Sequence, residues 1–457
     1  MRITVKIVIL VILLSGVFVL FYESFYSSTK IAKNTGWTPE GLSQIVNSSN
    51  SFGLKLFKLI QQSNPNNNIM ISPYGVFSTL LLLYNGAGGK TYEELKNVLN
   101  LNEPNYINPN FGELYNILMN TGGNYELKIA NGLFLNKDYE FKPTFINTAK
   151  DYFLAETENI DVTNRVKSAE TINNFISQNT NGLINNVISP SDINESTVLV
   201  MANAIYFYGK WATKFNKEDT KPRDFYISPK DVIKVQTMVA YDVPLKYGIF
   251  GDIEVVEIPY KGNNTAMVVI TPYNLYYDLY HLIGNPCIRL KEENLYNLSN
   301  IISNLTLDNS EENLCDLSNI ISNLTLDNLY YYLNNLYETV ADKLYMPKFS
   351  FEGKYDLIPY LKSLGINTIF NPGSSNLSNI VYSKSPDENL YVSLFKQFTY
   401  IENNEEGTKA AAATVIGAVT VALRELVIKI DRPFIFMIID LRTKEILFIG
   451  QVVNPSS

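Results

Sequence analysis

The side chains that most often carry enzyme chemistry are scarce in this chain of 457 residues. It has one histidine, His281, and two cysteines, Cys287 and Cys315. One histidine cannot build a two-histidine metal site, and a Ser-His-Asp arrangement would have to use His281, which has no nucleophile motif near it. The GxGxxG, GxxxxGKS/T and GxSxG motifs are also missing. We therefore expect no enzyme activity, no metal and no cofactor, and we interpret His281 as a structural or surface residue.

Two cysteines allow one disulfide bridge at most, which excludes a disulfide framework. Cys315 lies in a duplicated segment whose other copy has Tyr296 at the matching position. Two free thiols are therefore favoured over a bridge between Cys287 and Cys315, although both arrangements stay open.

Composition bounds the class of protein further. The chain is 46% hydrophobic and 18% charged, and its formal net charge is −8. This apolar content is ample for the core of one large domain or two ordinary ones. No basic run offsets the acidity, so we expect no nucleic-acid partner.

A segment near the C-terminus has the most unusual composition. Glu405, Glu406 and Gly407 open a run of small residues, and residues 410–423 carry no charge. The run is too short to span a bilayer, which needs about 20 apolar residues. It could be a helical turn, a low-complexity linker or an aggregation-prone strand. A fourth possibility is a strand that is held outside its sheet.

Physical arguments make the fourth possibility specific. Extended, residues 407–421 reach about 50 Å, and Gly407 supplies a hinge. If Lys409 marks the solvent side, the opposite face carries Thr408, Ala410, Ala412, Thr414, Ile416, Ala418 and Thr420. All but Ile416 are small enough to pass between two strands. About a dozen new ladder hydrogen bonds, each contributing roughly 0.5–1.5 kcal/mol, would stabilise the inserted form by on the order of 10 kcal/mol.

The N-terminus resembles an export signal or a membrane anchor. Arg2 and Lys6 precede residues 7–22, which carry no charge. Residues 1–26 are therefore interpreted as a cleaved signal peptide or a retained anchor, with neither favoured. Residues 27–40 form a predicted linker and residues 41–457 a single predicted domain. In either case we expect an extracytoplasmic protein, secreted or tethered to the outer face of a membrane.

Local patterns predict an α+β fold. Ser72 and Pro73 should begin a buried helix that ends near Gly86. Thr91 and Glu94 have the spacing of a capping box, which predicts the start of the next helix. The predicted strands cover residues 127–135, 198–208, 266–270, 344–346, 427–430, 434–439 and 446–453.

A tandem repeat of 19 residues covers 292–329. Glu292–Ser310 and Glu311–Leu329 are identical at 16 of 19 positions. Two copies are too few for a solenoid. The repeat is either a binding protrusion or, as we favour, a duplicated surface helix or loop.

Motifs along residues 41–455 together resemble the serpins, the serine protease inhibitors. Glu405-Glu406-Gly407-Thr408-Lys409-Ala410-Ala411-Ala412-Ala413-Thr414 is similar to the reactive-loop hinge of that family. Further matching motifs are Asn68-Ile69-Met70-Ile71-Ser72-Pro73, Gly86-Ala87-Gly88-Gly89-Lys90-Thr91, Asn203-Ala204-Ile205-Tyr206-Phe207-Tyr208-Gly209-Lys210-Trp211, Pro347-Lys348-Phe349 and Asp431-Arg432-Pro433-Phe434.

The resemblance implies three β-sheets, eight or nine helices and an exposed reactive loop at residues 405–425. It also implies a mechanism in which a serine protease attacks the loop and forms an acyl-enzyme. The cleaved loop then inserts into the large sheet and traps the protease in a covalent 1:1 complex. The inhibitor is expected to be a monomer. A non-inhibitory serpin (carrier, chaperone or storage protein) and an inhibitor of a cysteine protease are the alternatives.

The family's spacing from Gly407 places the scissile bond at Val421-Ala422. Thr420-Val421 and Ala422-Leu423 are neighbouring alternatives. All of these residues are small or aliphatic, which favours an elastase-like or subtilisin-like target over a trypsin-like one.

Two positions depart from the family pattern. Gln397 stands where the family usually has a histidine beneath the opening of the sheet, a region to which Ser72 and Asn203 also belong. Because glutamine both donates and accepts hydrogen bonds, we expect that a bond between Gln397 and Asn203 can persist. Lys409 replaces the more usual glutamate, with little effect expected because it faces outward.

Overall fold

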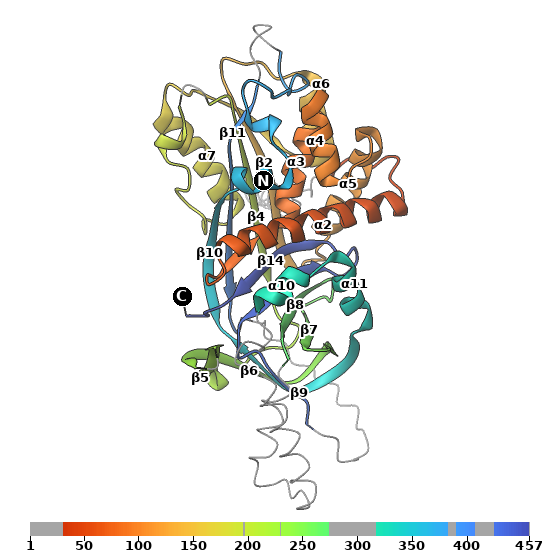
Figure 1. The fold of residues 1–457 in the computed structure, drawn as a ribbon, viewed down its shortest axis with the longest axis vertical. Coiled ribbons are helices and arrows are strands. Elements are labelled where there is room, and N and C mark those ends of the chain that lie inside the picture. The colour runs from red at the N-terminus through yellow and green to blue at the C-terminus, as the bar shows by residue number, and fades with distance from the viewer. Residues whose placement is uncertain are drawn as a thin grey trace, which may run out of the picture.

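The computed structural model describes residues 31–194, 197–228, 230–273, 317–382, 390–406 and 425–456. Figure 1 shows an elongated molecule in which most helices gather around one half, and the strands labelled β5 to β9 lie in the other. Nine α-helices lie within the described ranges, in line with the eight or nine expected. They are α2 (Pro39–Ser63), α3 (Pro73–Gly86), α4 (Gly89–Leu99), α5 (Pro104–Met119), α6 (Pro143–Phe153), α7 (Arg165–Asn179), α10 (Leu317–Asn323), α11 (Leu326–Asn335) and α12 (Ile358–Leu364).

A five-stranded sheet runs along the long axis of the molecule (Figure 1). Its order is β10 (Phe349–Asp356), β11 (Val392–Asn403), β4 (Leu199–Gly209), β2 (Tyr125–Asn136) and β3 (Glu156–Ile160). The strand predicted at residues 198–208 is β4, and its near-continuous apolar sequence is explained by burial on both faces. Residues of β4 contribute to two separate apolar clusters, one on each side of the sheet.

The other strands form one continuous nine-stranded sheet. Its order is β1 (Ile69–Ile71), β14 (Ile446–Val452), β13 (Phe434–Asp440), β8 (Thr265–Pro272), β7 (Ile253–Pro259), β6 (Asp231–Phe250), β9 (Tyr337–Pro347) and β12 (Val427–Lys429), and β5 (Lys221–Ser228) pairs with β6. The three sheets expected thus form two hydrogen-bonded networks. Two of the expected sheets are joined into the nine-stranded network because the 20-residue β6 pairs with β5, β9 and β7 along its length.

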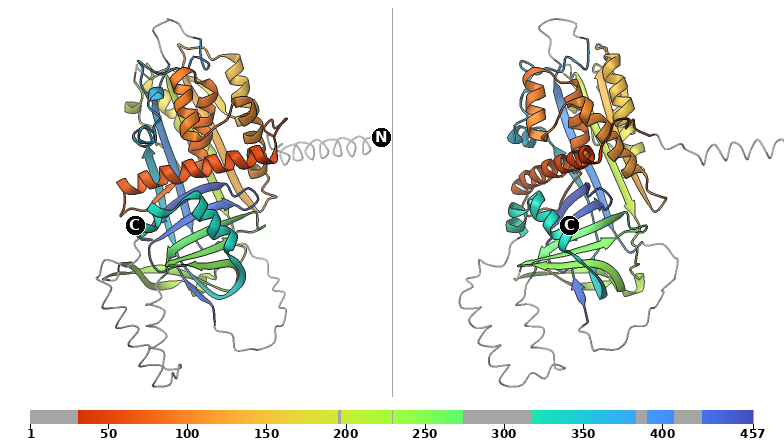
Figure 2. Two further views of the ribbon diagram at one scale, coloured as in Figure 1. Left: turned by 45° about the vertical axis from the view of Figure 1, so that its right-hand side comes forward. Right: turned by 90° about the vertical axis from the view of Figure 1, so that its right-hand side faces the viewer.

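Helices cover the two faces of the five-stranded sheet differently. On one face, Ile172, Phe175 and Ile176 of α7 pack against Phe134 of β2 and Val200 of β4. On the opposite face, α3 packs beneath β4. Figure 2 shows α7 on one side of this sheet and the α3–α4 helices on the other. A strand that entered this sheet would therefore have to shift at least one of these layers.

The helix predicted to begin after Ser72 is confirmed as α3, and the predicted capping box of the next helix is wrong. Ser72 Oγ accepts the Gly75 N–H at 3.1 Å, as an N-cap should. Helix α4 begins at Gly89, with Gly88 as its N-cap, so Thr91 lies inside the helix. Glu94 instead accepts the backbone N–H groups of Asn367 and Thr368, each at 2.8 Å. Glu94 therefore attaches α4 to the turn at Asn367 and Thr368 and does not cap the helix.

The start of the described chain lies against the helical half. Ala32 is buried, its N–H donates to Asn116 Oδ1 at 2.8 Å, and its carbonyl accepts from Asn116 Nδ2 at 2.9 Å. The apolar residues 7–22 lie outside the described part of the chain. Within the described ranges, no helix has the length and apolarity needed to cross a membrane.

A carboxyl group is buried without a cation between α2 and the turn that joins β13 to β14. Glu445 is fully buried and its Oε1 accepts the Ser49 hydroxyl at 2.5 Å, while its Oε2 has no hydrogen-bond partner among the described residues. Burial raises the pKa of Glu445 well above its ordinary value, and the Asp440 carboxylate raises it further. Glu445 is therefore held in its protonated form to a higher pH in the folded chain than in the unfolded chain.

This burial predicts a pH dependence of stability. Because the folded state binds this proton more tightly, the free energy of unfolding should fall as pH rises above 4.5, the ordinary pKa of glutamate. One such group contributes a slope of at most about 1.4 kcal/mol per pH unit. We expect Glu445→Gln, which cannot ionise, to gain stability relative to the wild type between pH 5 and pH 8 in urea unfolding. Parallel pH profiles for the two proteins would contradict this.

Candidate functional site

The uncharged segment connects the two sheets. Strand β11 ends at Asn403, residues 410–423 of the uncharged segment follow, and the chain then returns to β12, which pairs in parallel with β9. Glu406 is the last described residue before it. Gly407, Thr408, Lys409, Ala410, Ala411, Ala412, Ala413 and Thr414 of the predicted hinge, and Val421 and Ala422 of the predicted reactive bond, lie outside the described residues. The structure therefore defines the two attachment points of this segment and the sheet beside it.

The first attachment point is built around Glu405. Its side chain is 5% exposed; Oε2 lies 2.8 Å from Lys348 Nζ, and Oε1 accepts the Thr220 hydroxyl at 2.7 Å. Burial alone would raise the pKa of Glu405, but the hydrogen bonds from Lys348 and Thr220 outweigh it and hold the pKa below its ordinary value. Trp211 Nε1 also donates to the carbonyl of Asn404 at 3.1 Å. The chain is thus fixed two residues before Gly407.

The outer attachments are weaker. Glu406 Oε1 lies 3.2 Å from Lys217 Nζ, and both side chains are more than half exposed. At the return point, Glu425 Oε1 lies 2.6 Å from Lys343 Nζ, and the Leu426 N–H donates to Asp342 Oδ2 at 2.6 Å. Because solvent screens exposed ion pairs, Glu406 should contribute much less to holding the chain than Glu405 does.

Strands β11 and β4 are neighbours that run parallel. Their register runs from Val392 opposite Leu199 to Phe398 opposite Ala204, and the pairing ends there. Beyond this point β11 is paired on its other side with β10, and β4 on its other side with β2. The facing edges of residues 399–403 and 205–209 are therefore open towards each other.

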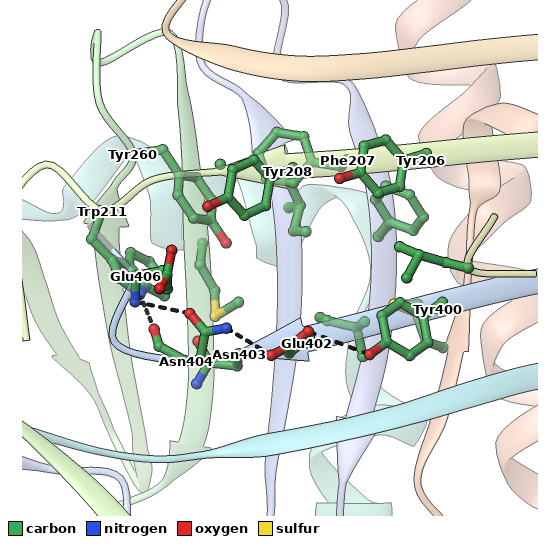
Figure 3. Close-up of a pocket in the computed structure, with 17 residues that line it drawn as sticks. Tyr206, Phe207, Tyr208, Trp211, Tyr260, Tyr400, Glu402, Asn403, Asn404 and Glu406 are labelled. Carbon is green, nitrogen blue, oxygen red and sulfur yellow. Dashed lines mark hydrogen bonds between the residues drawn. The ribbon is translucent and has the colours of Figure 1, made fainter. Parts of the chain in front are cut away.

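A cleft of about 240 Å³ occupies the interval between these open edges. Figure 3 shows Tyr206 and Tyr208 of β4 on one side of it and Tyr400 and Glu402 of β11 on the other. Glu406 also lines the cleft, so the chain enters the uncharged segment at its mouth. A segment that reversed direction after Glu406 would lie antiparallel to both β11 and β4, the arrangement with the better hydrogen-bond geometry.

The paired part of β11 and β4 is supported from below by Ser72 and Gln397. Gln397 Oε1 accepts the Ser72 N–H at 3.1 Å, and its Nε2 donates to the Ser72 carbonyl at 3.0 Å. Both residues are buried. Gln397 therefore binds the first turn of α3 to β11 through two hydrogen bonds.

The expected bond between Gln397 and Asn203 is not formed. The two residues are register partners across β11 and β4, but Asn203 Nδ2 donates to Asn131 Oδ1 at 2.9 Å. Within the described part of the chain, Asn203 Oδ1 has no hydrogen-bond partner. Gln397 uses its oxygen and its nitrogen on the Ser72 backbone, which explains the difference. The position of Asn203 also explains why residue 75 is a glycine, because a Cβ atom at residue 75 would overlap Asn203 Oδ1.

Sequence analysis missed part of this site. Thr220 and the role of Lys348 were not identified, although Lys348 lies in the quoted motif Pro347-Lys348-Phe349. The two consecutive carboxylates before Gly407 were a usable signal. If either of them is buried, it needs a cation or hydrogen-bond donors as partners. The structure shows that Glu405 is the paired one.

The buried pair predicts a difference between two similar substitutions. Lys348→Met removes the cation from Glu405 and should lower the free energy of unfolding by about 1–2 kcal/mol, allowing for the partial exposure of Lys348. Lys217→Met removes the exposed partner of Glu406 and should change it by less than about 0.5 kcal/mol. Urea unfolding followed by tryptophan fluorescence measures both. Equal losses would show that Glu405 is no better anchored than Glu406.

Comparisons with known proteins match this architecture. The family model described as Serpin (serine protease inhibitor) matches residues 47–309 and 310–455. A leukocyte elastase inhibitor from Xenopus laevis is 30% identical over 407 residues, covering 88% of this chain and 97% of the relative. Alaserpin from Manduca sexta is 31% identical over 425 residues, covering 91% and 95%. The crystal structure of native protease nexin-1 with heparin has a TM-score of 0.74 and 25% identity, covering 91% of this chain and all of that one.

Proposed function

This chain belongs to the serpin family, and on that basis we propose that it is a single-use covalent inhibitor of serine proteases and not an enzyme. One observation carries the proposal. Parallel strands β11 and β4 pair directly over half their length and then open into a cleft, at the point where the uncharged segment leaves β11. This geometry suits the entry of one antiparallel strand.

The proposed reaction begins as ordinary proteolysis. The catalytic serine of the protease attacks the carbonyl carbon of Val421; the new ester bond forms as the Val421-Ala422 peptide bond breaks, and the amino group of Ala422 leaves with a proton. Ala422 stays attached to β12, while residues 407–421 become free at one end. They then enter between β4 and β11 and carry the acylated protease away from Ala422.

The composition of the segment supports this step. Thr408, Ala410 and Ala412 share the face that we propose turns inward, and they are small enough to pass between the strands. Anchoring of Glu405 by Lys348 and Thr220 holds the chain at the mouth of the cleft just before the proposed hinge begins. Insertion can therefore begin next to Glu405 without a search for the sheet.

The proposed target has a shallow, apolar specificity pocket. Val421 is aliphatic, and two neighbouring choices of scissile bond would present Thr420 or Ala422 instead. Relatives named leukocyte elastase inhibitor support an elastase-like target. We further propose that the protein acts outside the cytoplasm, because residues 1–26 have the pattern of a signal peptide or an anchor.

Mixing the protein with an elastase-like serine protease should give a 1:1 complex that survives denaturing electrophoresis, and mass spectrometry should locate the ester at Val421. A protease whose catalytic serine is replaced by alanine is the control, and it should give no such band. If a panel of serine and cysteine proteases yields only cleaved inhibitor, the proposed function is wrong and the chain is a non-inhibitory serpin.

Thr408→Arg tests the inward face. A charged side chain that must be buried opposes insertion, so we expect this variant to be cleaved as a substrate and to lose at least about nine-tenths of its complex formation. Lys409→Arg is the matched control; it adds no charge and lies on the face proposed to meet solvent, so its yield of complex should equal that of the wild type. Unchanged inhibition by Thr408→Arg would reverse the facing assignment.

A further inference from the structure

We propose that the two copies of the tandem repeat compete for one position in the fold. This position, the α10 seat, is the surface of α2, β8 and β13 on which residues 317–324 pack. Residues 298–305 of the first copy, which lie outside the described residues, are the proposed second occupant. The inference concerns the body of the domain and does not depend on protease inhibition.

The α10 seat is filled by four apolar side chains that are at most 6% exposed: Leu317, Ile320, Ile321 and Leu324. Two polar contacts with α2 fix the occupant further. Gln61 Nε2 donates to Ser318 Oγ at 3.2 Å, and Lys58 Nζ donates to the Ser322 carbonyl at 2.8 Å. Figure 1 shows α10 lying between α2 and the β8 region.

The first copy repeats this occupant without change. Residues 298–309 are identical to residues 317–328 at every position, so Leu298, Ile301, Ile302 and Leu305 match the four apolar side chains and Ser299 matches Ser318. The three differences within the repeat (Tyr296 for Cys315, Asn297 for Asp316 and Ser310 for Leu329) all lie outside these residues. Side-chain chemistry therefore cannot distinguish the two occupants of the α10 seat.

The family model matches the chain in two stretches, residues 47–309 and 310–455, which meet within one residue of the junction between the two copies. The break in the match therefore falls at the duplication.

Chain connectivity, in contrast, does distinguish the two occupants. With residues 317–324 seated, residues 273–316 form one connection from β8; with residues 298–305 seated, residues 273–297 and 306–325 form two connections. Closing two loops costs more entropy than closing one. The observed arrangement also joins α10 to α11, because Asn328 Nδ2 donates to the Asn323 carbonyl at 2.9 Å. We infer that the second copy is the major occupant.

Helix α11 should stay in place during the exchange. Leu329 is fully buried, and the first copy has Ser310 at that position. Tyr330 also donates to Asn47 Oδ1 at 2.9 Å. The exchange therefore moves 19 residues of chain from one side of the α10 seat to the other and leaves its neighbours unchanged.

Disulfide trapping tests the exchange directly. In full-length protein carrying Cys287→Ser and Cys315→Ser, Gln61→Cys is combined with Ser318→Cys, with Ser299→Cys, or with the control Asn300→Cys, whose counterpart Asn319 is exposed. Adding Ile321→Asp disables the second copy. We expect it to raise the Ser299→Cys cross-link at least tenfold, well above the Asn300→Cys control, and to abolish the Ser318→Cys cross-link. No rise at Ser299→Cys, or cross-links found only between two chains, would overturn the proposal.

Thermal unfolding gives a second, independent measurement. Ile321→Asp should lower the melting temperature by only a few degrees in the full chain, because the first copy replaces the damaged one. In a chain lacking residues 292–310 the same substitution should lower it by at least three times as much, or prevent folding. Equal losses in the two chains, or failure of both to fold, would overturn the exchange.

Discussion

The parallel pairing of β11 with β4 is the constraint on which the other features of the site depend. A chain that leaves the end of β11 and folds back runs antiparallel to both strands, so it can hydrogen-bond to both. Only a pair that runs parallel and opens at the end where the chain leaves offers this position. The cleft, the anchored Glu405 and the run of small residues are useful together because this pair lies beside them.

Strands β11 and β4 are each attached to a different neighbouring element. Gln397 of β11 binds Ser72 at the start of α3, and Asn203 of β4 binds Asn131 of β2. One attachment lies on each side of the β11–β4 pairing, where a new strand would enter. No side-chain hydrogen bond joins Gln397 to Asn203 across it. A histidine at position 397 is not needed for this, since the glutamine amide supplies both the donor and the acceptor. The departure from the family pattern therefore keeps α3 attached to β11 and leaves β4 separately attached to β2.

Sequence analysis anticipated those features whose signal is local. The apolar run at residues 198–208 and the Ser72 N-cap each express their structure in neighbouring residues. Thr91 and Glu94 misled because a threonine and a glutamate three residues apart can cap a helix or bond to a distant turn, and only tertiary structure decides between them. The partners of Glu405, Thr220 and Lys348, are separated by more than one hundred residues of sequence and meet only in the folded chain. The 20-residue β6 was missed because its apolar residues do not alternate along its whole length.

If the chain works as proposed, its native form persists because a kinetic barrier separates it from the inserted form. Entry of the new strand would have to break the direct pairing of β11 with β4, which runs from Val392 opposite Leu199 to Phe398 opposite Ala204. A dozen new ladder bonds would favour the inserted form by on the order of 10 kcal/mol. Under the proposed mechanism, equilibrium favours the inserted form, and the rate at which β11 separates from β4 determines how long the native form lasts. The ladder between β11 and β4 must break before the strands separate and therefore controls this rate, whereas the bonds of Gln397 to Ser72 and of Asn203 to Asn131 can survive the separation.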